Sequence, residues 1–246
     1  MSNTFKAVFA LFPSLVRLAR GAVVKGHRKQ PKKPLEFYEA EYCPFCRHVR
    51  ETLTELDLDA YVYPLPKGGT RFKEQLEALG GKAKVPFLHD PNTGKKLYES
   101  EDIANYLYEE YGMEGSSAPH RMLTLSVLAT ALRSSKGMFA KPSKAPAKRL
   151  ELYSFEASPY SRLVRETLCE LEIPFYLHNV AKGEGRFVDW LPPGVRKNYE
   201  PPTENRRKLV ERGGKMMVPY LVDPNTRLAM YESAEIQRYL LKTYSA

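Results

Sequence analysis

Two stretches of the chain carry the same succession of apolar and polar positions. In the first stretch, short apolar runs alternate with segments whose apolar residues recur at helical spacing. The pattern predicts strands at 35–38, 61–63, 85–89 and 96–98, and helices before Asp57, at 71–79 and at 100–111. The order βαβαββα predicts an α/β fold whose sheet is parallel in the βαβ part and antiparallel in the final hairpin.

The second stretch is a repeat of the first. Residues 35–72 and 150–187 share 18 identities in 38 positions at an offset of 115, which is too many for a chance match between segments of this kind. Further along the offset becomes 133, where Asp90-Pro-Asn-Thr matches Asp223-Pro-Asn-Thr. The second copy therefore contains an insertion, within about 188–206, whose proline and charge content predicts an exposed loop.

These repeats divide the chain into four parts. They are a leader at 1–34, a first domain at 35–112, a linker at 113–149 and a second domain at 150–246. Within the linker, apolar positions at 119–133 predict a connecting helix. The Lys- and Pro-rich stretch at 141–148 predicts a stiff, solvated segment.

The leader has an amphipathic pattern. Between Phe5 and Val23 the apolar residues fall on one stripe at helical spacing, and basic residues such as Arg17 and Arg20 fall opposite, which predicts an amphipathic N-terminal helix that Pro13 kinks or splits. Three interpretations stay open: a helix docked on the protein's own domains or on a second copy in an oligomer, a helix in peripheral contact with a membrane through residues 5–24, and an organelle presequence. No run of 18 apolar residues occurs, so a membrane span is not expected.

The positive charge of the chain lies outside the repeats. The formal net charge is +9, yet residues 1–34 hold eight Lys and Arg with no acid, and residues 112–149 hold seven against one acid. The repeats themselves are therefore mildly acidic. A basic face built into the fold, which a nucleic-acid partner would need, is not expected, whereas the leader would be attracted to anionic surfaces.

The three cysteines indicate redox chemistry in a reducing environment. Three are too few for a secreted disulfide scaffold, and the close pair Cys43 and Cys46 points to a reducing intracellular compartment. The cytoplasm is the simplest such place, and the leader leaves a membrane-peripheral or organellar location open. The count excludes a four-cysteine zinc site, and the five histidines show no ligand spacing, so no metal is expected.

The Cys-Pro-Phe-Cys segment carries the clearest chemistry. Cys43 falls where a strand ends and a helix begins, so unpaired backbone N–H groups place partial positive charge on its sulfur. Pro44 suits the first helical position. Cysteines in such motifs reach pKa values of roughly 3.5–7.5, against about 8.5 for a free thiol. We expect Cys43 to be the nucleophile, aided by Arg47 and Arg50, and Cys46 to be the resolving thiol. The alternatives are a buried structural pair and iron–sulfur binding between two chains.

Three motifs in order resemble a known family. Cys43-Pro-Phe-Cys46 after a strand, Val85-Pro86 before a strand and Glu99-Ser100 at a helix start are similar to glutaredoxins and to the N-terminal domain of glutathione transferases. The resemblance implies two tandem thioredoxin-like domains of the glutaredoxin type, a cis Val85–Pro86 bond and glutathione as cofactor. It implies a glutathione site formed by Pro44, Phe45, Lys84, Val85, Pro86, Glu99 and Ser100. Lys67 is an alternative to Lys84 for one glutathione carboxylate. The all-helical C-terminal domain of full transferases has no counterpart here.

The second copy keeps two of the three motifs but has serines in place of the two cysteines. Ser158-Pro-Tyr160-Ser161 replaces the cysteine motif, while Val218-Pro219 and Glu232-Ser233 remain. A hydroxyl with ordinary acidity cannot exchange disulfides, so this domain is expected to be redox-inactive. Two interpretations stay open: a second glutathione cleft, formed by Ser158, Tyr160, Val218, Pro219, Glu232 and Ser233, or a domain kept for structure or partner binding. Cys169 falls mid-helix beside apolar residues and is expected to be a packed thiol.

The sequence thus predicts a glutathione-dependent thiol–disulfide oxidoreductase with thiol or disulfide substrates. Two other functions stay open. A leader combined with Cys-Pro-Phe-Cys also resembles membrane-associated prostaglandin E synthase type 2, which implies a glutathione-binding transferase or isomerase. A non-catalytic scaffold on a membrane or partner protein is the third interpretation.

Overall fold

The computed structural model describes residues 21–27, 29–119, 136–184, 186, 189, 191 and 200–246. Most of the predicted leader helix, the connecting helix at 120–133 and most of the insertion lie outside the described residues. At the end of the leader, Val23–Val24 form strand β1 instead of helix, because β1 pairs in parallel with β8 (Lys182–Gly183). No described helix is long and apolar enough to cross a bilayer.

The first repeat folds in the predicted order. Its elements are β2 (Leu35–Glu39), α2 (Pro44–Glu55), β3 (Ala60–Pro64), α3 (Lys73–Gly80), β4 (Phe87–Asp90), β5 (Lys95–Tyr98) and α4 (Ser100–Tyr111). The strand expected at 85–89 begins two residues later, after Pro86, which has no N–H to donate to a sheet. The buried residues of α2 include Val49 and Leu53, and the buried Leu56 follows directly after the helix.

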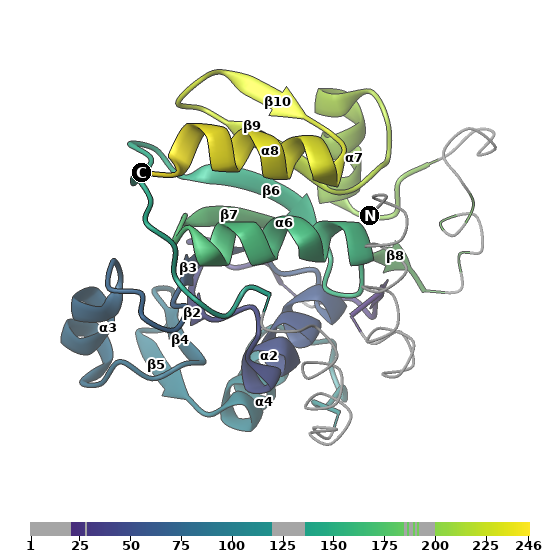
Figure 1. Cartoon of the computed structure of the whole chain (residues 1–246). Helices are drawn as coiled ribbons and strands as arrows, with labels where there is room; N and C mark the ends of the chain where they lie inside the picture. Colours follow the sequence, from purple (N-terminus) through teal and green to yellow (C-terminus); the bar gives the residue numbers. More distant parts are fainter. Residues whose placement is uncertain are drawn as a thin grey trace.

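The second repeat folds in the same way. Its elements are β6 (Leu150–Ser154), α6 (Pro159–Glu170), β7 (Phe175–Asn179), the short β8, α7 (Glu204–Gly213), β9 (Tyr220–Asp223), β10 (Leu228–Met230) and α8 (Ser233–Tyr244). The prediction of an α/β chain with two tandem thioredoxin-like units is confirmed. Figure 1 shows the first repeat in purple to teal below the second in green to yellow.

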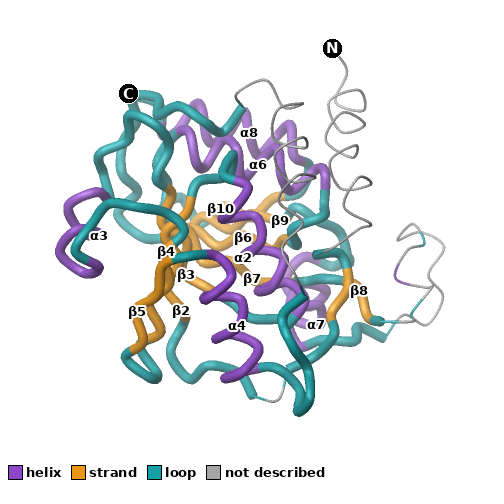
Figure 2. Tube along the Cα trace, turned by 90° about the horizontal axis from the view of Figure 1, so that it is seen from below, coloured by secondary structure: helices purple, strands orange, loops and turns teal. Residues whose placement is uncertain are grey.

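Both repeats share a single sheet, which the sequence did not predict. Its strand order is β10-β9-β6-β7-β3-β2-β4-β5. The halves meet where β3 and β7 pair antiparallel, with Tyr61 opposite Tyr176, and the two rings make an edge-to-face contact at 5.0 Å. Figure 2 shows these strands running through the middle of the molecule with helices around them. Strands β3 and β7, which would each be an exposed edge strand in a separate repeat, are therefore paired.

A buried cluster of charged side chains also joins the repeats. Arg50 of α2 donates to Glu156 at 2.8 Å, and Arg165 of α6 donates to Glu41 at 3.0 Å and to Glu156 at 2.8 Å. Glu41 and Glu156 occupy equivalent positions of the two repeats, as do Arg50 and Arg165, and all four are buried. Buried charges are stable only when they are paired in this way.

One carboxylate in each repeat fixes the last helix to the hairpin. Asp90 accepts hydrogen bonds from the hydroxyls of Tyr106, at 2.6 Å, and Tyr111. Asp223 does the same for Tyr239, at 2.7 Å, and Tyr244. These contacts set where α4 and α8 lie, and so where the Glu-Ser pair at the start of each helix is placed.

The segment predicted to be stiff and solvated, at 141–148, makes backbone contacts that the sequence did not predict. Most of its side chains are exposed, yet its backbone is tied to the folded domains: Lys141 N–H donates to Glu170 O and Lys144 N–H to Tyr244 O, both at 2.7 Å. Just before it, the backbone of Lys67 exchanges hydrogen bonds with Met138 and Ala140. The composition predicted a stiff segment, and these backbone hydrogen bonds to neighbouring elements hold it in place.

Candidate active site

The Cys43 sulfur lies at the mouth of helix α2. Cys43 is the N-cap residue, and its sulfur accepts a hydrogen bond from the backbone N–H of Cys46 at 3.4 Å. Pro44 takes the first helical position, as expected. The Cys43 backbone is itself fixed, since its N–H donates to Ala40 O at 2.9 Å. The sequence places the sulfur here because β2 ends four residues earlier and the proline can only begin, not continue, a helix.

The two thiols of the motif have opposite tendencies to ionise. A hydrogen bond from the Cys46 thiol, and after it the backbone N–H groups of Cys46 and Phe45, lower the pKa of Cys43 to about 7 in spite of burial. Burial raises the pKa of Cys46 well above its ordinary value. Cys43 keeps 9% of its surface exposed and Cys46 keeps none. Cys43 is thus the more readily ionised and the less completely buried thiol of the pair.

Arg50 connects this site with the buried charge cluster. Its positive charge contributes to the lowered pKa of Cys43, and its guanidinium is held by Glu39, by Glu156 and by the backbone oxygen of Glu41 at 3.2 Å. Arg47, expected to act beside it, instead pairs with Glu51 at 3.3 Å and with Glu156 at 3.4 Å. The second repeat therefore supplies the carboxylate, on Glu156, that orients both arginines behind the thiol.

The other two motifs lie at the same end of the strands as Cys43. Strand β2 runs into the turn before Cys43. Strand β4 is antiparallel to β2 and begins directly after Val85-Pro86, and β5 is antiparallel to β4 and ends directly before Glu99-Ser100. The Val85–Pro86 peptide bond is cis, as the resemblance implied. Val85 and Phe45 pack against the same apolar cluster that contains Cys43.

Charged side chains are present at this end of the strands. Lys84 pairs with Glu99 at 2.5 Å, and both side chains are more than half exposed. Glu99 has a positive φ of 59° and forms the N-cap of α4, while Ser100 is fully buried. The ammonium of Lys67 lies 5.6 Å from the centre of the Tyr42 ring, next to Cys43 in the chain. Lys84 and Lys67, the two candidates for binding a glutathione carboxylate, thus both contact residues of the site.

Tyr42 is a site residue that the sequence reasoning missed. Burial and the neighbouring cysteines Cys43, Cys46 and Cys169 raise the pKa of its hydroxyl to about 12. Its ring packs against the apolar cluster around Cys43. Comparison of the repeats offered a signal, because the equivalent residue in the copy without the two cysteines is Ala157.

The equivalent site of the second repeat has the same backbone and different chemistry. Ser158 is the N-cap of α6 and accepts from the Ser161 N–H at 3.2 Å. The Val218–Pro219 bond is cis and Glu232 has a positive φ of 69°. Two buried hydroxyls, those of Ser161 and Ser233, have no hydrogen-bond partner among the described residues.

That second site differs from the first in its side chains as well. Tyr160, in place of Phe45, is 42% exposed. Met217 stands where the first repeat has Lys84, so Glu232 lacks the lysine pair made by Glu99. The second repeat therefore keeps the backbone of the site but lacks its two thiols and the lysine that corresponds to Lys84.

The remaining cysteine is a packed thiol. Cys169 is 1% exposed, and its sulfur accepts from the backbone N–H of Glu41 at 3.5 Å. Burial, followed by the charge of Glu39, raises its pKa well above the ordinary value. All three cysteines are free thiols. Within the described ranges, no group of three His, Cys, Asp or Glu side chains is arranged to hold a metal ion.

Comparisons with solved structures return glutathione-related proteins. A delta-class glutathione transferase of Nilaparvata lugens is 29% identical over 33% of this chain and 38% of its own, with a TM-score of 0.29. A glutathione transferase of Bombyx mori is 27% identical over 38% and 43%, with a TM-score of 0.32. Glutaredoxin 2 of Salmonella typhimurium, solved with glutathione, is 23% identical over 31% and 33%, with a TM-score of 0.25. The chain thus spans less than half the length of these structures.

Family models give the more informative match. A comparison with curated proteins found no match. The model described as "Glutathione S-transferase, N-terminal domain" matches the chain twice, at residues 37–117 and 152–246. The two matches coincide with the two repeats and together cover well over half of the sequence. The chain therefore belongs to the glutathione S-transferase N-terminal-domain family, with two copies of that domain in tandem.

Proposed function

We propose that the protein is a glutathione-dependent thiol–disulfide oxidoreductase in which Cys43 is the nucleophile. The observation that carries the proposal is the contrast between two adjacent thiols. Cys43 is ionisable near neutral pH and keeps 9% of its surface exposed, while Cys46, three residues on, is fully buried and has a raised pKa. Disulfide exchange needs one thiol of each kind, since the thiolate attacks and the second thiol resolves.

The chemistry follows from these positions. The Cys43 thiolate attacks one sulfur of a disulfide substrate; a Cys43–substrate disulfide forms and the substrate S–S bond breaks, releasing a thiolate. Cys46 then attacks the Cys43 sulfur, its proton passes to the second departing sulfur, and a Cys43–Cys46 disulfide forms. The substrate gains the two electrons that the two cysteines lose. Helix α2 favours the first step because its amides stabilise the Cys43 thiolate.

Glutathione is the cofactor indicated by the family, and the residues present fit it. A thiol tripeptide with two carboxylates and one ammonium needs a sulfur partner and charged groups of both signs. Cys43 supplies the first, and Glu99, Lys84 and Lys67 supply the second at the same end of the strands. The start of α4 at Ser100 adds backbone N–H groups suited to a carboxylate. When bound, glutathione supplies the reducing equivalents that return the cysteines to thiols.

The second repeat has a different role in this proposal. Ser158 lacks a thiol, so this copy takes no part in disulfide exchange. It contributes Glu156, which orients Arg50 behind Cys43. The unpartnered hydroxyls of Ser161 and Ser233 support a binding cleft rather than a purely structural domain, because buried polar groups are normally satisfied.

The test is reduction of a glutathione mixed disulfide by wild type and by Cys43→Ser. The substitution should leave the fold intact, since Ser158 already forms the same N-cap bond in the second repeat. We expect Cys43→Ser to lose at least about 100-fold in kcat/KM, a loss of about 2.7 kcal/mol of transition-state stabilisation, while Cys169→Ala retains activity. Undiminished activity in Cys43→Ser would instead favour the scaffold interpretation.

A further inference from the structure

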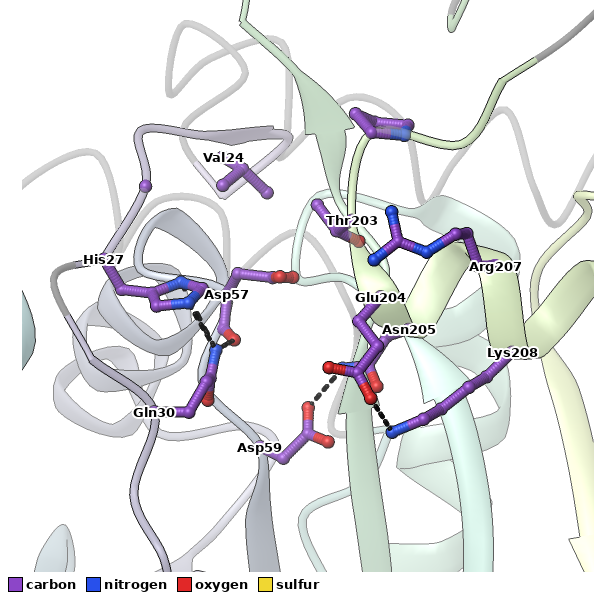
Figure 3. Close-up of a pocket in the computed structure, with 12 residues that line it drawn as sticks. Val24, His27, Gln30, Asp57, Asp59, Thr203, Glu204, Asn205, Arg207 and Lys208 are labelled. Carbon is purple, nitrogen blue, oxygen red and sulfur yellow. Dashed lines mark hydrogen bonds and ion pairs between the residues drawn. The ribbon is translucent and has the colours of Figure 1, made fainter.

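A cavity away from the cysteine site lies between the two repeats. It has a volume of about 520 Å³, within the range typical of small-molecule sites. One wall comes from the segment before β2 and the turn between α2 and β3, with His27, Gln30 and Asp57. The other wall is the first turns of α7, where Arg207 and Lys208 lie (Figure 3).

Asp57 is the unusual group of this cavity. It is 4% exposed, and its Oδ1 has no hydrogen-bond partner among the described residues. Figure 3 shows its carboxyl group pointing across the cavity toward Thr203. Burial, and next the charge of Asp59, raise the pKa of Asp57 to about 8 although Arg206 opposes them, so this carboxyl group is mostly uncharged at neutral pH until a cation binds beside it and lowers its pKa. A buried carboxyl oxygen without a hydrogen-bond partner is costly unless something binds there.

The internal repeat shows which side chain lies beside the equivalent carboxyl group. The residue equivalent to Asp57 is Glu172, which has nearly the same backbone, with φ of 49° against 52°. There Arg71 fills the space: its backbone N–H donates to the Glu172 carboxylate at 2.9 Å, and its guanidinium donates to the backbone oxygens of Leu171, at 2.9 Å, and Glu172, at 2.5 Å. The counterpart of this cavity is thus occupied by the protein's own arginine.

The matching arginine of the second repeat is directed elsewhere. Arg186 is equivalent to Arg71, but its guanidinium donates to Glu200 O at 2.6 Å and lies 3.7 Å from the Asp189 carboxylate. Both partners lie in or beside the insertion that the first repeat lacks. The insertion has therefore drawn the arginine away from Asp57, whose backbone oxygen accepts from Gln30 at 2.8 Å while its carboxyl group faces the cavity.

We propose that this cavity binds a basic amino acid, with its cationic side chain against Asp57 and its carboxylate against Arg207. The cation takes the place that Arg71 holds in the other repeat. Asp59 adds a second carboxylate on the same side. Arg207 stands on the opposite wall in Figure 3 and can reach an anionic end. The site is separate from the cysteine site, so its failure would leave the proposed redox function untouched.

Titration calorimetry of the full chain with L-arginine, L-citrulline and agmatine tests this site. Citrulline has the shape of arginine without the positive charge, and agmatine lacks the carboxylate. We expect saturable arginine binding and citrulline binding weaker by about tenfold or more, which corresponds to about 1.4 kcal/mol. Agmatine should bind, and its affinity should be insensitive to Arg207→Gln, whereas that of arginine should fall.

Variants complete the test. Asp57→Asn should weaken arginine binding by about tenfold or more, while the matched control Glu172→Gln should leave it unchanged, because Arg71 already fills the equivalent site. Equal binding of arginine and citrulline, wild-type affinity in Asp57→Asn, or no saturation with arginine would each overturn the proposal. The ligand comparison uses wild-type protein, so it decides the matter even if Asp57→Asn fails to fold.

Discussion

At the scale of single residues, two cysteines three positions apart differ because of what surrounds them. Cys43 caps a helix and receives hydrogen bonds, whereas Cys46 is enclosed by apolar side chains. The sequence predicted the position of Cys43 at a helix start, since a strand, a cysteine and a proline in that order define such a start. It could not identify Tyr42 as a neighbour of all three sulfurs, because Cys169 approaches from the other repeat.

The first prediction concerns the hydrogen bond between the two thiols. Donation from the Cys46 thiol is the largest cause of the lowered pKa of Cys43. Cys46→Ala removes that donor, so the pKa of Cys43 should rise and the pH midpoint of its alkylation should move upward. Cys169→Ala, which removes a thiol without removing that donor, is the control. An unchanged midpoint in Cys46→Ala would mean that the backbone amides alone set the ionisation of Cys43.

At the scale of elements, arginines of helices α2 and α6 meet at one buried carboxylate, that of Glu156. The sequence suggested that arginines near Cys43 simply add positive charge. The structure shows in addition that Arg47, Arg50, Arg162 and Arg165 surround Glu156 and hold its pKa well below the usual range, although burial acts in the opposite direction. Equivalent arginines in both repeats were visible in the alignment, but their pairing across repeats depends on a tertiary contact that no local pattern specifies.

Loss of the Glu156 charge should therefore destabilise the whole chain. Glu156→Gln leaves four buried arginines with less compensation, and breaking a buried pair typically costs about 3–5 kcal/mol of unfolding free energy. Glu235→Gln removes an exposed carboxylate that pairs with Arg238 and should change stability by less than about 0.5 kcal/mol. Urea denaturation measures both. Similar effects of the two substitutions would mean that the buried cluster is not what holds the repeats together.

At the scale of the molecule, the two repeats are one structural unit. The order and approximate bounds of the elements followed from periodicity and from the internal repeat, as did the division into two domains of one type. The pairing of β3 with β7 could not be predicted, because an edge strand can pair with any other edge strand and the alignment of the two repeats does not indicate which one. The backbone hydrogen bonds of the linker with Lys67 and Glu170 could not be predicted either, because no local pattern indicates the partner of an unpaired backbone group.

A shared sheet and a shared charge cluster predict cooperative unfolding. We expect a single urea transition in far-UV circular dichroism, with backbone amides of β2 and β6 exchanging hydrogen with the same opening free energy. Both strands lie inside the same eight-stranded sheet. Two resolved transitions, or exchange that is markedly faster in one repeat, would show that the repeats are independent domains that merely touch.

The most direct measurement of the central claim is the rate of iodoacetamide alkylation of Cys43 as a function of pH, followed by mass spectrometry of the Cys43 peptide. Only the thiolate reacts, so the rate rises with pH through the pKa of Cys43. The account predicts a midpoint at about pH 7, with Cys46 and Cys169 unreactive over the same range. A Cys43 midpoint at about 8.5 or above, the value of a free thiol, would contradict it.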